Sequence, residues 1–409
     1  MPKLSDRAHK LPASPIRKLA GYADAAKARG THVYHLNIGQ PDIETPPQFF
    51  QAIQNANLKV LAYSPSNGYE SLRNAIADYY GRIGHELKNT EILVTTGASE
   101  ALGFVFGAIL NPGDEVIVPE PYYANYSSFS LEKDATVVPV TTRIEDDFAL
   151  PDMSEFENRI TPRTRAILIC NPGNPTGILY PRESLEKLQR ICLKHNLFLV
   201  ADEVYREFVY DSLQHHSVLG LSGMDQHAIV VDSVSKRFSA CGARIGCVVS
   251  RNADLLQAIM KMAQARLSPP TFGQIGSEAV YRLPAEFYET ALAEYSARRD
   301  VLLAELAKIE GVVCPQVNAA FYAMVQLPVE NADDFCRWLL EEFSHNGATV
   351  MLAPGAGFYA TPGLGQNEVR IAYVLNRDDL AKAVDCLRVA LQEYSEKKPS
   401  ARKTAVARN

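Results

Sequence analysis

The sequence predicts an α/β protein with a mostly parallel, seven-stranded sheet sandwiched between helices, and a smaller α+β domain. From about residue 90, short β-branched runs alternate with turn residues and helical patterns. The runs show little alternation of polar and apolar residues, which is typical of strands buried on both faces of a helix-covered sheet. The seven runs are residues 92–95, 115–118, 135–140, 166–170, 197–201, 228–231 and 245–249.

The composition is that of an ordinary globular protein. The chain has 409 residues, 47% of them hydrophobic, and a formal net charge of −6. A mildly acidic chain lacks the basic face that nucleic-acid binding needs, so we expect no nucleic-acid partner. The seven cysteines form no CxxC pair, and their spacing indicates neither a disulfide framework nor a metal site.

We expect four segments along the chain. Residues 1–45 form an N-terminal arm and part of the small domain, 46–290 a large ligand-binding domain, and 291–395 the small C-terminal domain. Residues 396–409 are rich in Lys, Arg, Ser and Ala without apolar periodicity, which is typical of a disordered tail. No apolar run approaches the roughly 20 residues of a membrane helix, and residues 1–10 hold no apolar signal segment. A cytoplasmic location without membrane contact is therefore expected.

Polar loops follow four of the predicted strands, at the sheet edge where α/β proteins bind ligands. Residues 96–100, Thr-Gly-Ala-Ser-Glu, open a helix, and small residues at a helix N-terminus allow a phosphate to approach. A plain helix cap explains the same residues. Residues 171–177, Asn-Pro-Gly-Asn-Pro-Thr-Gly, form a turn in which proline can hold an asparagine amide toward a ligand.

The other two loops carry charge. Asp202 ends an apolar strand, where a carboxylate is costly to bury unless a cation meets it; a helix cap is the simpler alternative. Lys236 follows the strand at 228–231 in Asp-Ser-Val-Ser-Lys, and partial burial would make its amine nucleophilic. Arg244, in Gly-Ala-Arg-Ile-Gly, can bind a phosphate through two N–H groups. A solvated surface loop is the alternative for both.

Together these loops resemble the class I/II aminotransferases, which are pyridoxal-5′-phosphate (PLP) enzymes of fold type I. Asn-Pro-x-Asn-Pro-Thr-Gly, Asp-x-x-Tyr, Ser-x-Ser-Lys and Gly-x-Arg-x-Gly occur here in the family's order. Lys236 and Arg244 have the family's spacing, and the resemblance extends from about residue 17 to residue 394.

The resemblance implies roles for individual residues. Lys236 would form the Schiff base with PLP and move a proton between the substrate Cα and the cofactor. Asp202 would hold the pyridine nitrogen protonated, while Asn174 and Tyr205 would bind the phenolate oxygen. Tyr123 would stack on the ring. The phosphate would be held by Ala98, Ser99, Ser233, Ser235 and Arg244.

The resemblance also implies a homodimer with shared sites. Tyr63 matches the tyrosine that reaches the phosphate bound by the neighbouring subunit. Arg370 matches the arginine that binds the substrate α-carboxylate, with Gly39 and Asn174 beside it. The glycine-rich stretch at 355–360 looks like a dinucleotide fingerprint, but no βαβ unit follows it; in the family it is a small-domain loop.

Three classes of function remain open. The first is ping-pong transamination between an L-amino acid and a 2-oxo acid, with aspartate and 2-oxoglutarate as the favoured pair and aromatic or branched-chain substrates as the alternative. The second is another PLP reaction, such as β-elimination or decarboxylation. The third is a ligand-sensing regulator, which the lack of a DNA-binding domain disfavours.

The amino-acid substrate depends on a second cation for a distal carboxylate. Arg17, in the arm, and Arg266, in Ala-Arg-Leu-Ser-Pro-Pro, are the candidates, with a solvated surface charge as the alternative for each. An acidic-amino-acid branch of the family has a lysine where Ser99 stands, so this chain would need a different cation.

Overall fold

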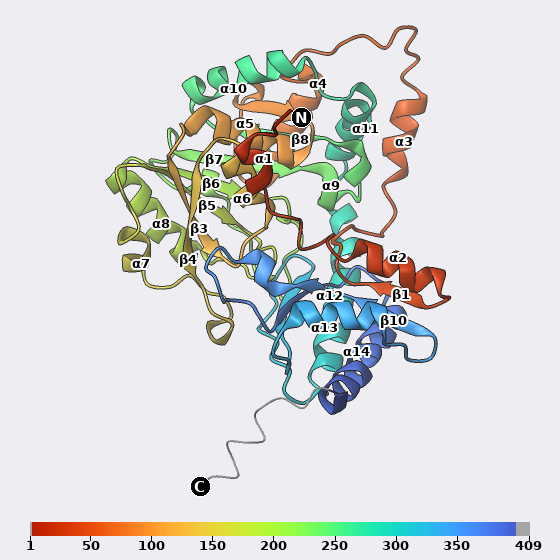
Figure 1. Cartoon of the computed structure of the whole chain (residues 1–409). Helices are drawn as coiled ribbons and strands as arrows, with labels where there is room; N and C mark the ends of the chain where they lie inside the picture. The colour runs from red at the N-terminus through yellow and green to blue at the C-terminus, as the bar shows by residue number, and fades with distance from the viewer. Residues whose placement is uncertain (1, 398–409) are drawn as a thin grey trace.

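The computed structural model describes residues 2–397, and its larger domain is built on a seven-stranded sheet (Figure 1). The strand order is β2-β8-β7-β6-β5-β3-β4, and neighbours are parallel except around β8, which is antiparallel to β2 and β7. The strands are β2 (Ile92–Thr95), β3 (Glu115–Glu120), β4 (Thr136–Thr141), β5 (Thr164–Cys170), β6 (Phe198–Asp202), β7 (Ala228–Ser233) and β8 (Gly246–Val249). The predicted α/β class and seven-stranded sheet are confirmed.

Helices cover both faces of this sheet, because successive strand residues point to opposite sides. On β5, Ile167 and Ile169 enter one apolar core, while Ala166 and Leu168 enter the core on the other face. The first core is closed by α4 (Glu70–Arg82), α8 (Arg182–His195) and α11 (Thr271–Tyr281), the second by α5 (Gly97–Ile109), α6 (Asn125–Leu131) and α10 (Ala253–Arg266). Burial on both faces explains why the strand sequences do not alternate.

The smaller domain contains two short sheets. Strand β1 (His32–His35) pairs in parallel with β10 (Ala348–Met351), and β12 (Glu368–Ala372) lies antiparallel between β11 (Ala353–Pro354) and β9 (Tyr322–Gln326). Its helices are α2 (Ala20–Ala28), α12 (Glu286–Leu306), α13 (Ala332–Glu341) and α14 (Arg377–Lys397). Figure 1 shows the N-terminal α2 and β1 beside these C-terminal elements.

The predicted segment boundaries remain predictions. Helix α12 (Glu286–Leu306) runs without a break through residue 290, so the predicted boundary between the large and small domains falls within a helix. Of the predicted tail, Glu396 and Lys397 belong to α14, and residues 398–409 lie outside the described part of the chain.

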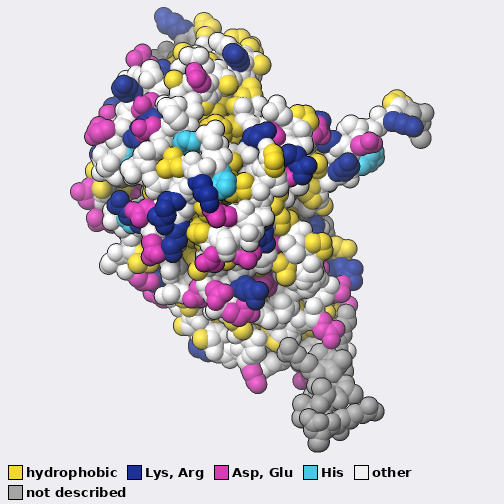
Figure 2. All heavy atoms as spheres, turned by 90° about the vertical axis from the view of Figure 1, so that its left-hand side faces the viewer, with side chains coloured by type: hydrophobic (Ala, Val, Ile, Leu, Met, Phe, Trp, Pro, Cys, Tyr) yellow, Lys and Arg dark blue, Asp and Glu magenta, His cyan; other side chains and the backbone are white. Residues whose placement is uncertain are grey.

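The remaining elements are short. They are α1 (Asp6–Lys10), α3 (Pro47–Gln54), α7 (Met153–Glu157), α9 (Val234–Arg237) and the 3-10 helices η1 (Asn89–Glu91), η2 (Ile144–Asp146), η3 (Val218–Gly220), η4 (Cys241–Ala243) and η5 (Gly355–Phe358). The first residues project from the body (Figure 2), and an ion pair between Arg7 and Asp134 tethers them. Acidic and basic side chains are interspersed on the face that Figure 2 shows.

Within residues 2–397, no helix has both the length and the apolar character needed to cross a membrane.

Candidate active site

A cavity with a volume of about 620 Å³ lies where strands of the large domain end against the small domain. It gathers residues from segments far apart in the sequence, including most of the predicted site. Those residues are Arg17, Gly39, Ala98, Ser99, Tyr123, Asn174, Asp202, Tyr205, Ser235, Lys236, Arg244 and Arg370. Ser233 is the last residue of β7, adjacent to this wall.

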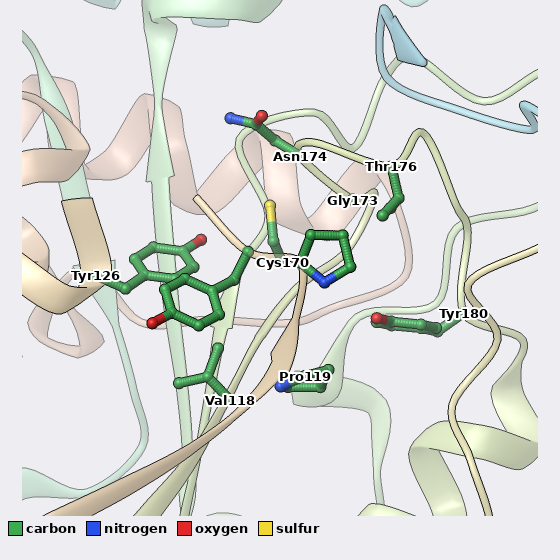
Figure 3. A pocket seen from close by; sticks show the side chains of 10 residues that line it. Val118, Pro119, Tyr126, Cys170, Gly173, Asn174, Thr176 and Tyr180 are labelled. Atoms are coloured by element: carbon green, nitrogen blue, oxygen red, sulfur yellow. The ribbon is translucent and has the colours of Figure 1, made fainter. Parts of the chain in front are cut away.

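A second cavity lies behind the 171–177 loop and is far smaller. Figure 3 shows Tyr126, Cys170 and Asn174 among the side chains around it. Its volume is about 10 Å³, which is the space of about one water molecule. This second cavity is therefore too small for an amino acid.

Asp202 is a buried carboxylate at the end of β6, only 5% exposed. Tyr126 donates a hydrogen bond of 2.8 Å to its Oδ2, and the Val204 N–H approaches Oδ1 at 3.4 Å. Burial raises the pKa of Asp202 from its ordinary 3.8 to about 6, and the nearby Asp232 adds to the rise, while Tyr126, Val204 and Lys236 oppose it. A buried carboxylate of this kind favours a cationic partner in the cavity.

Lys236 reaches the same cavity from α9, the single helical turn that follows β7. Its Nζ donates a hydrogen bond of 2.8 Å to the Gly39 carbonyl oxygen. The turn begins with Ser233, whose Oγ accepts a hydrogen bond from the Ser235 N–H at 3.1 Å. The amine is thus half-buried and held by a neutral acceptor.

A cradle for an anion lies at the start of α5. Gly97 has φ +76°, and a Cβ there would lie 2.4 Å from Nη2 of Arg244. A Cβ on Gly246 would lie 2.6 Å from the carbonyl carbon of Gly97. Only glycine allows this approach of a helix N-terminus, a guanidinium and the loop. The arrangement suits a phosphate, since backbone N–H groups and positive charge converge.

Arg370 is a buried guanidinium, 1% exposed, on β12. Nη1 donates to Asn174 Oδ1 at 3.0 Å and Nη2 to the Asn37 carbonyl at 2.5 Å. Its carbon lies 4.5 Å from the centre of the Tyr322 ring and 5.1 Å from that of Phe358. Burial lowers the pKa of Arg370, and no described carboxylate pairs with it. A buried, unpaired cation facing a cavity is a site for a carboxylate.

Three tyrosines form a further wall. Tyr205 receives a weak hydrogen bond from Asn174 Nδ2 at 3.5 Å and lies 3.0 Å from the Tyr322 hydroxyl, oxygen to oxygen. A Cβ on Gly39 would lie 1.7 Å from the Tyr322 hydroxyl oxygen, so residue 39 is restricted to glycine. Tyr123 accepts a hydrogen bond from Asn125 at 2.8 Å, and burial raises its pKa to about 12.

Three further predicted site residues differ from one another in whether they line the cavity and whether they form ion pairs. Tyr63 is 79% exposed and does not line the cavity of its own chain. Arg266 pairs with Glu100 at 2.6 Å and donates to Thr96 Oγ1 at 3.2 Å, also away from the cavity. Arg17 lines the cavity and forms no ion pair with any residue from 2 to 397.

Comparison with known proteins gives the family. The family model "Aminotransferase class I and II" matches residues 31–387. The aspartate aminotransferase of Bacillus subtilis is 32% identical over 404 residues, covering 96% of this chain and 100% of the relative. The chain belongs to the class I and II aminotransferases.

Solved structures agree. The aspartate aminotransferase of Thermus thermophilus with maleate superimposes with a TM-score of 0.85 at 30% identity, covering 95% of this chain and all of the other. An alanine aminotransferase from Pyrococcus furiosus gives 0.87 at 28% identity, covering 96% and 100%. This aminotransferase is therefore a PLP-dependent transaminase by family.

The cavity fits the cofactor of the family. The Gly97 and Gly246 cradle has room for a phosphate only because neither residue carries a Cβ. Asp202 offers a buried anion for a ring nitrogen, and Lys236 offers an amine. Arg370 leaves Nε without a hydrogen-bond partner among the described residues.

Two contacts of this aminotransferase were missed by the sequence analysis. Tyr126 holds Asp202, and Tyr322 joins Tyr205. Tyr126 lies three residues after the predicted Tyr123, and the turn that opens α6 brings the two rings to 5.5 Å, centre to centre. For Tyr322 no local signal existed, because its partner Tyr205 is 117 residues away in the chain.

Proposed function

We propose that this aminotransferase exchanges the amino group of aspartate with 2-oxoglutarate by a ping-pong mechanism. The observation that carries the acidic substrate is the free guanidinium of Arg17 in the same cavity as Arg370. Besides Lys236 and Arg244, which the proposal assigns to the cofactor, the cavity is lined by Arg17 and Arg370, and these two cations match the two carboxylates of aspartate. Relatives named aspartate aminotransferase support the choice.

The site residues act on a bound amino acid as follows. Arg370 binds the α-carboxylate, with Asn174 holding the guanidinium from behind at 3.0 Å. Arg17 binds the distal carboxylate. The amine of Lys236 takes the proton from the substrate Cα and returns it on the cofactor side.

PLP, when bound, supplies an electron-accepting ring that stabilises the negative charge left at Cα. The chain would hold it by Asp202 at the ring nitrogen, Asn174 and Tyr205 at the phenolate oxygen, and Tyr123 against the ring. Ala98, Ser99, Ser233, Ser235 and Arg244 would hold the phosphate, and Lys236 would bind the aldehyde carbon. The Tyr126 hydrogen bond keeps the Asp202 carboxylate directed and anionic.

The proposal includes a homodimer. Residues between α3 and α4 expose Leu58, Val60, Leu61 and Tyr63 on a segment that runs at the periphery of the molecule (Figure 1). An exposed apolar stretch of this kind favours contact with a second copy. Tyr63 would then reach the phosphate in the neighbouring site. A cytoplasmic location also remains a prediction.

The substrate assignment is tested by comparing Arg17→Ala with Arg266→Ala. We expect Arg17→Ala to raise the KM for aspartate about tenfold more than the KM for alanine, since a charged hydrogen bond is lost. Arg266→Ala serves as the control, because its partner is Glu100, and should change both KM values alike. Equal effects of Arg17→Ala on both substrates would contradict the assignment.

The reaction class is tested by the half-reaction, in which aspartate is added without a 2-oxo acid. Aspartate added to the purified enzyme should convert bound PLP to pyridoxamine phosphate, with one oxaloacetate released per site. Failure of a broad panel of amino acids to give this half-reaction, with pyruvate and ammonia formed instead from an amino acid that carries a β leaving group, such as cysteine, would indicate β-elimination.

A further inference from the structure

The loop formed by residues 355–361 contacts three other parts of the molecule. Tyr122, on the large domain, donates its N–H to the Phe358 carbonyl at 2.9 Å. Pro15, on the N-terminal arm, is buried against Gly357. Phe358 lies over Arg370 of the small domain. This loop is the glycine-rich stretch that resembles a dinucleotide fingerprint in sequence.

Glu120 fixes the loop to the large domain. It is the last residue of β3 and is 0% exposed. Its Oε2 accepts the N–H groups of Ala360 and Thr361 at 2.8 and 3.0 Å, and its Oε1 accepts the Thr141 hydroxyl at 2.8 Å. A buried carboxylate with both oxygens occupied holds a backbone segment firmly.

Gly357 allows the N-terminal arm to pack closely against the loop. A Cβ on Gly357 would lie 2.4 Å from Cβ of Pro15 and 2.9 Å from its Cγ. Carbon atoms in contact lie about 3.5 Å apart, so any side chain here pushes the arm outward by about 1 Å. Pro15 can rest against the loop only because residue 357 is glycine.

The arm that packs on the loop also contains Arg17, and hydrogen bonds fix its backbone there. The N–H groups of Arg17 and Lys18 both bond to the Ser14 carbonyl, at 3.2 and 3.0 Å, forming one turn. The Ile16 carbonyl accepts Asn37 Nδ2 at 2.8 Å, and Asn37 also accepts Arg370 through its own carbonyl. Lys18 is ion-paired with Asp333. The arm is thus fixed on both sides of Arg17, while the Arg17 side chain stays free at the cavity.

We propose that the 355–361 loop sets the positions of both substrate-binding arginines, with Gly357 and Glu120 as positioning residues. Gly357 places Arg17 through Pro15, and Glu120 places Arg370 through Phe358. Gly357 therefore governs preference for a dicarboxylic substrate, while Glu120 governs binding of every amino acid. The inference rests on the proposed roles of Arg17 and Arg370.

The first test compares Gly357→Ala with Gly21→Ala in the PLP-loaded enzyme. Gly21 is the matched control, because a Cβ there meets nothing within 4 Å and its helix belongs to the same N-terminal region. We expect the Arg17 and Lys18 amides to exchange hydrogen about tenfold faster in Gly357→Ala, because the arm loses its seat. The KM for aspartate should rise about tenfold and that for alanine by less than about twofold. Gly21→Ala should change neither.

Unchanged exchange at residues 17 and 18, or an equal rise in both KM values, would overturn the role of Gly357. Pro15→Ala tests the same contact without overpacking and should also speed exchange, which covers the case in which Gly357→Ala fails to fold. If Arg17→Ala leaves aspartate preference intact, the proposed function of Arg17 fails; the exchange result then still decides whether Gly357 seats the arm.

The second test concerns Glu120. Glu120→Ala should raise the KM for alanine about tenfold, because alanine binds Arg370, and should raise the KM for aspartate at least as much, because the freed loop also positions Arg17. Glu120→Gln, whose amide oxygen can still accept the two N–H groups, should recover most of the loss, and Thr141→Val should have little effect. Unchanged KM values in Glu120→Ala would overturn the role of Glu120.

Discussion

At the scale of the residue, Lys236 shows how a site gains its chemistry from its surroundings. The amine rests on the Gly39 carbonyl at 2.8 Å and lines the same cavity as Asp202. Of its neighbours on α9, Ser235 lines the same cavity but carries no amine, and Arg237 is buried against Asp232. The turn therefore presents a single amine to the ligand.

Lys236→Ala should separate cofactor binding from covalent attachment. We expect the variant to bind PLP through the Arg244 cradle and Asp202, while losing nearly all turnover. Absorbance of bound PLP and reduction with borohydride, followed by mass measurement, check this. A borohydride-stable adduct in the variant would contradict the assignment.

The raised pKa of Asp202 gives a pH prediction. The pKa of Asp202 is 3.8 in the unfolded chain and about 6 in the folded chain, so the folded chain binds an extra proton between these pH values. The stability of enzyme prepared without PLP should therefore fall as pH rises from about 4 to about 6. A protonated ring nitrogen needs the carboxylate anion, so PLP affinity should weaken as pH falls below about 6.

This pH dependence is best measured in Lys236→Ala, where covalent attachment cannot contribute. Adding Asp202→Asn should weaken PLP binding about tenfold at neutral pH. Any pH dependence of PLP affinity that remains in this double variant comes from titration of the cofactor phosphate. If the two variants lose affinity in parallel below pH 6, Asp202 does not hold the ring nitrogen.

At the scale of the element, α9 has only four residues and cannot be stable as an isolated helix. The side chain of Arg237 stabilises this turn. Its Nη2 lies 3.1 and 3.0 Å from the two carboxylate oxygens of Asp232, and its Cζ lies 4.5 Å from the centre of the Tyr79 ring. Both charged side chains are 0% exposed.

Arg237→Met should destabilise the protein by about 3–5 kcal/mol, because it removes the closer cationic partner of the buried Asp232 and leaves Arg206, whose Nη1 lies 3.8 Å from Oδ2, as the remaining one. Asp232→Asn combined with Arg237→Met should recover much of that loss, since the poorly paired charge is removed. Thermal unfolding of the two single variants and the double variant checks this. Additive losses would mean that the two side chains act independently.

The elements also explain what the sequence could predict. Asp202, Lys236 and Arg244 occupy strand ends and loops, where local patterns reveal them. Arg266 could not be judged, because its partner Glu100 is 166 residues away in the chain and only the packing of α10 on α5 brings them together. Tyr322 and Glu120 were missed for the same reason, since their partners lie on other elements.

At the scale of the whole molecule, the proposed dimer follows from apolar surface that one chain leaves exposed. Val60 and Tyr63 are 75% and 79% exposed. Light scattering should give twice the mass of one chain, and Val60→Asp with Leu61→Asp should shift it toward the monomer. Tyr63→Phe should stay dimeric yet bind PLP less tightly. A monomer with full activity would contradict shared sites.

The buried Arg370 has a practical consequence. A guanidinium that no described acid neutralises attracts any small anion that enters the cavity. Acetate or formate should therefore compete with the amino acid, raising its KM while leaving kcat unchanged. Kinetic constants measured in carboxylate buffers would understate the affinity of the enzyme, and buffers with bulky zwitterions should be chosen instead.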